Sequence, residues 1–187
     1  NVVMTWGMRT NGRTGQSIDY HDWTNAFRAL PVGDADLSAG RALGFFKDWI
    51  EHPAYDDYWN AIDVEDKWKE IDVPAFSMGG WFDLYSADAF TNFNGIRKNG
   101  RTPEARQSRL IVGPWPHALS TSSKTGDVDF GAGSLADLDG EETRWFDYWL
   151  KGIDNGIVDE PPLRLFIMGI NEWRDEHEWP LARTDWQ

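Results

Sequence analysis

The segment from Val73 to His117 constrains the fold of this chain more than any other, because it reads as a strand, a helix and a second strand. The apolar run Val73–Met78, followed by two glycines, predicts a buried strand that ends in a turn. Apolar side chains then recur at helical spacing over residues 86–98, and Leu110–Val112 predicts a second buried strand. The segment therefore has the size of a βαβ unit.

A polar residue follows each predicted strand, Asp83 after the first and His117 after the second. Parallel strands present their carboxyl ends at the same edge of a sheet, which is where ligands bind in open α/β folds. We therefore expect the two side chains to lie within hydrogen-bonding reach. An Asp followed by a His in this arrangement fits the Ser…Asp…His order of a hydrolase triad. On the pattern alone, the alternative that both residues are simply solvated or structural stays open.

The residues of the two motifs favour the catalytic interpretation. Gly80-Trp81-Phe82-Asp83 and Gly113-Pro114-Trp115-Pro116-His117 resemble the Gly-Trp-Tyr-Asp and Gly-Pro-Trp-x-His signatures of the CocE/NonD hydrolases. That family includes cocaine esterase, α-amino-acid ester hydrolases, glutaryl acylases and related Xaa-Pro dipeptidyl-peptidases. The likeness extends over most of the chain, through residues 48–59 upstream and 145–156 downstream.

The resemblance implies an α/β fold: a fragment of an α/β-hydrolase, with a parallel sheet and a helical cap, that runs into a C-terminal β-sandwich of the jelly-roll type. We expect residues 1–70 to form the cap region and its lead-in, and 71–156 the C-terminal part of the hydrolase core. Residues 157–187 would begin the β-sandwich, with Leu163–Met168 as its first strand.

Two further helices are expected from the apolar pattern. Residues 64–71 resemble a short amphipathic helix. Gly140–Lys151 predicts the strongest helix of the chain, with Gly152 at its C-terminal cap and an aromatic face that covers the sheet.

The resemblance also implies roles for individual residues. Asp83 would be the acid of the triad and His117 its general base, with no cofactor and no metal ion. Residues that flank this pair are expected to contact substrate: Trp81, Phe82, Tyr85 and Trp115.

The nucleophile of the family stands in a Gly-x-Ser-Tyr-x-Gly turn, which this chain does not contain. Residues 75–79 match the variant Ala-x-Ser-x-Gly, but no helix begins directly after it, and Asp83 follows Ser77 by only six residues. We therefore expect Ser77 to be a strand residue. The chain would be part of a longer serine hydrolase whose nucleophile lies elsewhere, and the fragment alone would be inactive.

The expected substrate is a small ester or amide. Family members that act on α-amino esters carry carboxylates two and three residues after the triad aspartate. This chain has Tyr85 and Ser86 at those positions, which disfavours that specificity.

Composition excludes other classes of function. The net charge of −13 disfavours nucleic acid and anionic membranes as partners. No apolar run approaches the length of a membrane span, and no signal peptide is visible. We expect a soluble protein and favour a cytoplasmic location; a homo-oligomer stays open, and without cysteine the redox compartment is not indicated.

Two alternatives remain at this stage. Twelve tryptophans are compatible with a non-catalytic, aromatic-rich module that binds a carbohydrate-like ligand, which requires a row of exposed indoles. The hydrolase interpretation instead requires buried tryptophans and a short distance between Asp83 and His117. The second alternative is a complementing half of a split hydrolase.

Overall fold

The computed structural model describes residues 2–10, 23–65 and 67–185. They divide into two compact units, residues 1–63 and 64–187, so the boundary falls inside the predicted cap region and lead-in. The polar segment 11–22 of that region lies outside the described residues. Within the described ranges, no helix is both long enough and apolar enough to cross a bilayer.

The first unit is helical in its described part. Its core is formed by Met8, Leu43 and Phe46 together with three buried alanines. The helices are α1 (Val2–Thr10), α2 (Trp23–Ala26), α3 (Ala35–Ser38), α4 (Gly44–Glu51) and α5 (Asp57–Ile62).

A buried carboxylate organises the turn between α3 and α4. The side chain of Asp36 accepts hydrogen bonds from the backbone N–H groups of Leu37, at 2.8 Å, and Leu43, at 2.7 Å. Burying a charge without such partners would be costly, so Asp36 fixes the path of this segment.

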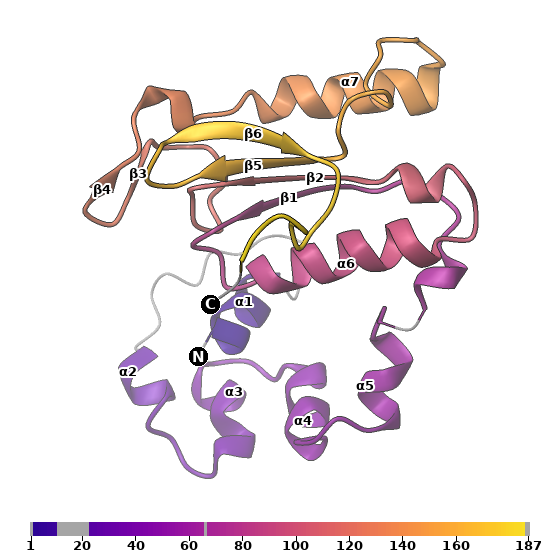
Figure 1. The fold of residues 1–187 in the computed structure, drawn as a ribbon. Coiled ribbons are helices and arrows are strands. Elements are labelled where there is room, and N and C mark those ends of the chain that lie inside the picture. Colours follow the sequence, from indigo (N-terminus) through magenta and orange to yellow (C-terminus); the bar gives the residue numbers. More distant parts are fainter. Residues whose placement is uncertain (1, 11–22, 66, 186–187) are drawn as a thin grey trace. The chain divides into compact units, whose positions relative to one another are not determined.

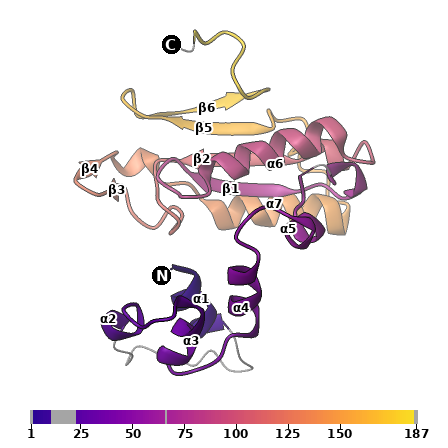
Figure 2. The same ribbon diagram turned by 90° about the horizontal axis from the view of Figure 1, so that it is seen from below.

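The second unit contains a four-stranded sheet of β1 (Phe76–Gly80), β2 (Arg109–Gly113), β5 (Leu163–Ile167) and β6 (Glu172–Glu176). The strand order is β1-β2-β5-β6 (Figure 2). β1, β2 and β5 run parallel, and β6 returns antiparallel to β5. The predicted βαβ unit is confirmed, because α6 (Ser86–Asn99) connects β1 to a parallel β2.

Helices cover both faces of this sheet (Figures 1 and 2). On one face, Phe90 and Phe93 of α6 form a core with apolar residues that alternate along the strands, Leu110, Val112, Leu163 and Leu165. On the other face, Trp145 of α7 (Leu138–Lys151) stacks on Phe76 of β1 with 5.7 Å between ring centroids.

The predicted first strand of a separate β-sandwich, Leu163–Met168, does not belong to such a domain. It contains β5, which pairs with β2 in parallel, with Leu163 opposite Leu110, and so lies in the same sheet as β1 and β2. Ion pairs reinforce this junction: the buried Arg109 contacts Glu160 at 3.0 Å, and Glu160 also binds Arg144 of α7. Sequence pattern did not reveal this pairing, because it depends on a partner strand some fifty residues away.

α7 follows the sequence prediction at both ends but only partly in its packing. Asp137 caps its first turn by accepting from the N–H of Gly140, and Gly152 ends it in the left-handed region with φ of 69°. Trp145 is buried as expected, whereas Phe146 and Leu150 are 50% and 76% exposed. Part of its apolar surface therefore does not face the sheet.

The predicted helix over residues 64–71 is reduced to a single turn, Trp68–Glu70. Trp68 explains the difference. Its indole lies directly over Gly95 of α6, where an added Cβ would sit 2.2 Å from the ring, and its Nε1 donates to Asn92 Oδ1. A tertiary contact with α6 has overridden the local helical pattern.

Gly79-Gly80 was predicted to form a turn but is the end of β1. The turn follows at Trp81 and Phe82. Glycine is required at position 80 because a Cβ there would lie 2.0 Å from the carbonyl oxygen of Trp115. The two loops beyond the parallel strands can approach each other only because this position has no side chain.

We predict that Gly80→Ala lowers the stability of the protein by about 1–3 kcal/mol, since it forces these two loops apart. Gly133→Ala is the matched control, because a Cβ at that position meets nothing within 4 Å. Urea-unfolding midpoints of both variants test this, and equal midpoints for the two would contradict the proposed close approach.

Candidate active site

Asp83 lies in a tight turn between β1 and α6. Its N–H donates to the carbonyl of Gly80, and its Oδ1 accepts from the N–H of Tyr85 at 3.0 Å. Short polar side chains that bond the backbone two residues ahead favour such turns. α6 begins three residues later, and the partial positive charge of a helix N-terminus favours a nearby carboxylate. The local sequence therefore orients Asp83 and favours its charged form.

The loop that carries His117 is held by Trp115. The indole N–H of Trp115 donates to the carbonyl of Gly79 at 2.9 Å, and its backbone carbonyl accepts from the N–H of Phe82. Trp115 is 1% exposed. Prolines on both sides of it restrict the backbone further. Trp115 therefore joins the loop after β2 to the loop after β1.

These two loops bring His117 against Asp83. Nδ1 of His117 lies 2.9 Å from Oδ2 of Asp83. The carboxylate is 7% exposed and the imidazole 72% exposed. A carboxylate accepts the hydrogen bond, so Nδ1 carries the proton and Nε2 is left as the basic nitrogen. The expected short distance is confirmed, and the pair has the geometry of an oriented general base.

The electrostatics of Asp83 keep it ionised. Burial by itself raises the pKa of this carboxyl group, but the hydrogen bonds from the Tyr85 N–H and from His117, with the charge of His117, outweigh burial. The net effect lowers the pKa of Asp83 below its ordinary value of 3.8. Asp83 is therefore a carboxylate at neutral pH.

The four residues expected to contact substrate divide into two groups. Phe82 and Tyr85 are 47% and 51% exposed, and the ring of Tyr85 lies edge-on to the imidazole of His117 at 5.7 Å. Trp81 instead stacks on Phe90 and donates its Nε1 to the carbonyl of Phe166, and Trp115 is buried. Phe82 and Tyr85 stay candidates for substrate contact, whereas Trp81 and Trp115 hold the framework.

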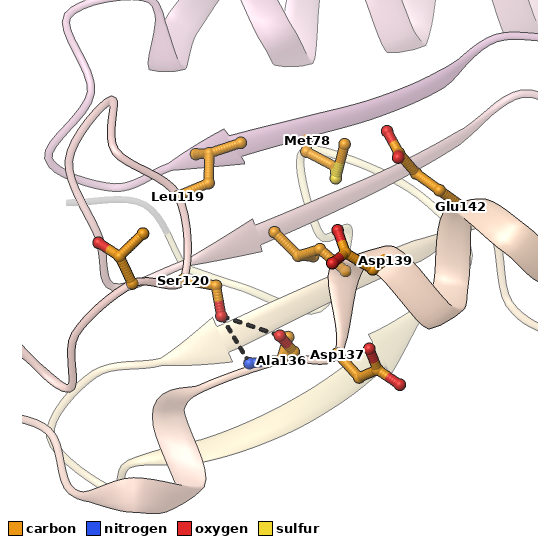
Figure 3. A pocket seen from close by; sticks show the side chains of 9 residues that line it. Met78, Leu119, Ser120, Ala136, Asp137, Asp139 and Glu142 are labelled. Atoms are coloured by element: carbon orange, nitrogen blue, oxygen red, sulfur yellow. Dashed lines mark hydrogen bonds between the residues drawn. The ribbon is translucent and has the colours of Figure 1, made fainter.

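The structure contains a pocket of about 410 Å³, and Leu119 and Ser120, which follow His117 in the chain, form part of its lining (Figure 3). Ser120 fixes its wall, since its Oγ donates to the carbonyl of Ala136 and accepts from the same residue's N–H. No motif indicated this pocket, because its walls come from β1, from the loop after His117 and from the segment that leads into the start of α7. Its lining includes Met78, Leu119, Ser120, Asp137, Asp139 and Glu142.

Ser77 lies in the middle of β1, opposite Leu110 of β2. A nucleophile elbow needs a sharp turn from strand to helix at the serine. The prediction that Ser77 is a strand residue is therefore confirmed.

The tryptophans that the structure describes do not form the exposed row that a carbohydrate-binding module requires. Among those that the structure describes, only Trp6 is more than half exposed. Trp115 and Trp145 are buried, and Trp81 and Trp179 pack with Phe90. Their main use in the described residues is packing.

We predict that Asp83→Asn destabilises the protein at neutral pH and that the difference from wild type shrinks in acid. Because folding lowers the pKa of Asp83, its contribution is present above the unfolded-state pKa of about 3.9 and is lost as the pH falls through the folded-state value. Unfolding free energies of both proteins at neutral pH and near pH 2 test this. A difference that does not depend on pH would contradict it.

Comparisons with known proteins agree with the motifs. Cocaine esterase of Rhodococcus sp. (strain MB1 Bresler) is 30% identical over 187 residues, which cover 94% of this chain and 31% of the esterase. The chain thus spans about a third of the length of this curated relative.

Two solved structures share the fold. An aminopeptidase from the marine sediment archaeon Thaumarchaeota archaeon superposes with a TM-score of 0.65 at 22% identity, over 95% of this chain and 30% of that one. An α-amino acid ester hydrolase superposes with a TM-score of 0.64 at 21% identity, over 96% of this chain and 31% of that one.

The sequence profile of the X-Pro dipeptidyl-peptidase (S15 family) matches residues 3–119. With more than half of its length matched, this chain belongs to the S15 family, in agreement with its resemblance to the CocE/NonD hydrolases.

Proposed function

We propose that this chain supplies the acid–base part of a serine hydrolase that cleaves ester or amide bonds through an acyl-enzyme. The observation that carries the proposal is the hydrogen bond between Asp83 Oδ2 and His117 Nδ1. Membership of the S15 family and the similarity to cocaine esterase support it.

In this proposal His117 transfers the protons. Its Nε2 takes the proton of the serine hydroxyl as the serine oxygen attacks the substrate carbonyl, and then delivers that proton to the leaving alcohol or amine. In the second half of the reaction it takes a proton from water and returns it to the serine. Asp83 holds the imidazole with Nε2 available and stabilises the imidazolium that forms.

The serine belongs, in this proposal, to sequence outside residues 1–187. Ser77 is within a strand, and Ser120 is hydrogen-bonded in both directions to Ala136. The chain spans only 31% of the length of cocaine esterase, so a protein of that size has ample sequence for a nucleophile and an oxyanion hole.

The residues beside the pair indicate a substrate without a required ammonium group. Tyr85 and Ser86 follow Asp83 at the positions where the α-amino ester hydrolases carry carboxylates, and neither brings a charge. The exposed rings of Phe82 and Tyr85 instead offer apolar contact for an acyl or alcohol group.

We predict that Asp83→Asn lowers kcat of the full-length enzyme on the order of 10³–10⁴-fold, because the imidazole loses the group that fixes its tautomer. His117→Ala should cost at least as much, and the double variant should be no worse than His117→Ala alone, since the two residues act as a unit. Asp88→Asn, an exposed carboxylate on α6, is the matched control. Steady-state kinetics with a p-nitrophenyl ester check these values; additive losses would argue against a dyad.

We predict that residues 1–187 alone show no serine-dependent turnover of p-nitrophenyl esters. Ser77→Ala should therefore leave the background rate of the isolated chain unchanged. Turnover that disappears with this substitution would assign the nucleophile to β1 and overturn the proposed division of the site.

A further inference from the structure

The imidazole of His117 is held by few atoms of the chain. Its side chain is 72% exposed, and its Nδ1 makes the 2.9 Å hydrogen bond to Oδ2 of Asp83. The Cβ of His117 and this hydrogen bond fix two points, and the ring can still tilt about the line that joins them. Such a tilt moves Nε2, which must stay within hydrogen-bond reach of the proton that a general base takes. A second contact that holds the plane of the ring therefore bears directly on the chemistry.

The ring of Tyr85 makes such a contact. Its centroid lies 5.7 Å from the centroid of the His117 imidazole, with an angle of 64° between the two planes. Aromatic rings prefer this edge-to-face arrangement over a face-to-face sandwich, at centroid distances of about 4.5–7 Å. The two contacts of the imidazole differ in kind, because Asp83 holds one atom and Tyr85 holds the ring.

The backbone of Tyr85 fixes the point from which its ring projects. Its N–H donates to Oδ1 of Asp83 at 3.0 Å, and its carbonyl accepts from the N–H of Ala89 at 3.1 Å. Tyr85 is the N-cap residue of α6, so the second bond is the first of that helix. Tyr85 thus contacts both members of the pair, the carboxylate through its backbone and the imidazole through its ring.

Packing of the fold does not account for the position of this ring. Tyr85 is 51% exposed, and the neighbouring Phe82 and Leu84 are 47% and 68% exposed. The ring of Phe82 lies against Phe130, at 5.9 Å between centroids, whereas the ring of Tyr85 lies against His117. An exposed phenol ring beside an exposed imidazole buries little apolar surface, so the contact matters mainly to the site.

We propose that Tyr85 is a positioning residue, whose ring holds the plane of the His117 imidazole and so keeps Nε2 directed at the reacting serine. The inference rests on the proposed function, in which His117 is the general base. Tyr85 acts here through His117, which is a role separate from contact with substrate. A misplacement of about 1 Å in a catalytic group costs on the order of 100-fold in rate, so a ring that limits this movement contributes to turnover.

Side-chain substitutions at Tyr85 separate its ring from its backbone. Both of its hydrogen bonds, to Asp83 and to Ala89, are made by the backbone, so Tyr85→Ala removes the ring and leaves them in place. Tyr85→Phe keeps the ring and removes only the hydroxyl. Leu84→Ala is the matched control, since it truncates an exposed side chain of the same turn.

The first test observes His117 by NMR in the full-length protein, with ¹⁵N-labelled histidine and without substrate. The Nδ1–H proton, assigned by its loss in His117→Ala, should exchange with water roughly 2- to 12-fold faster in Tyr85→Ala, because the imidazole leaves its hydrogen bond more often. Tyr85→Phe and Leu84→Ala should exchange at the wild-type rate. His52, whose Nδ1 lies 2.6 Å from Oδ2 of Asp56 in the first unit, is the internal reference. An unchanged His117 rate in Tyr85→Ala would overturn the proposal.

The second test uses steady-state kinetics of the full-length enzyme with a p-nitrophenyl ester. Tyr85→Ala should lower kcat roughly 2- to 12-fold at an unchanged KM, and Tyr85→Phe should restore kcat. A higher KM at an unchanged kcat would assign the ring to substrate binding and overturn the proposal. Equal losses in Tyr85→Phe and Tyr85→Ala would assign the effect to the hydroxyl and overturn it as well.

The NMR measurement needs neither a substrate nor the serine. If the catalytic proposal fails, the exchange rates of the His117 proton still decide whether Tyr85 holds the imidazole. If Tyr85→Ala leaves these rates unchanged while Asp83→Asn and His117→Ala abolish turnover, the positioning role fails and the catalytic proposal stands.

Discussion

The parallel pairing of β1 with β2 is the constraint on which the candidate site depends. The register sets Gly80 opposite Gly113, so both strands end at the same level. Asp83 and His117 then follow at similar short distances, and their side chains meet at 2.9 Å. A shift of register would separate the carboxylate from the imidazole without changing either loop. The register of the two strands therefore sets the distance between the two loops, and this distance lets Asp83 and His117 meet.

Trp115 holds the loops that follow the two paired strands against each other. Its indole bonds to the carbonyl of Gly79, its backbone bonds to Phe82, and its ring packs so closely on Gly113 that a Cβ there would lie 2.3 Å from it. Gly80 and Gly113 therefore act together with Trp115, because the large buried residue fits only where its neighbours have no side chains. The exposed ring of His117 is hydrogen-bonded to Asp83 and lies edge-on to Tyr85, so its position depends on the loop that Trp115 holds.

Much of the site and its frame could be predicted from sequence, because the signals were local. α6, β2 and the ends of α7 follow apolar periodicity and capping residues, and Asp83 and His117 follow the strands. The errors have one cause. Gly79-Gly80 continues a strand, the expected helix at 64–71 is a single turn, and β5 joins the first sheet, each because of a contact distant in sequence. The pocket lined by Met78, Ser120 and Asp137 was not predicted for the same reason, since its residues come from separate segments.

Apolar periodicity and short motifs were enough to identify the parallel βαβ unit, the order of the acidic and basic residues, and the family. The folded arrangement was needed to see which tryptophans touch solvent, which of Phe82, Tyr85, Trp81 and Trp115 are exposed beside the site, and which strands lie side by side in the sheet. Burial and strand order are properties of the assembled layers. Both depend on contacts between segments that are far apart in the chain, and local sequence patterns do not predict such contacts.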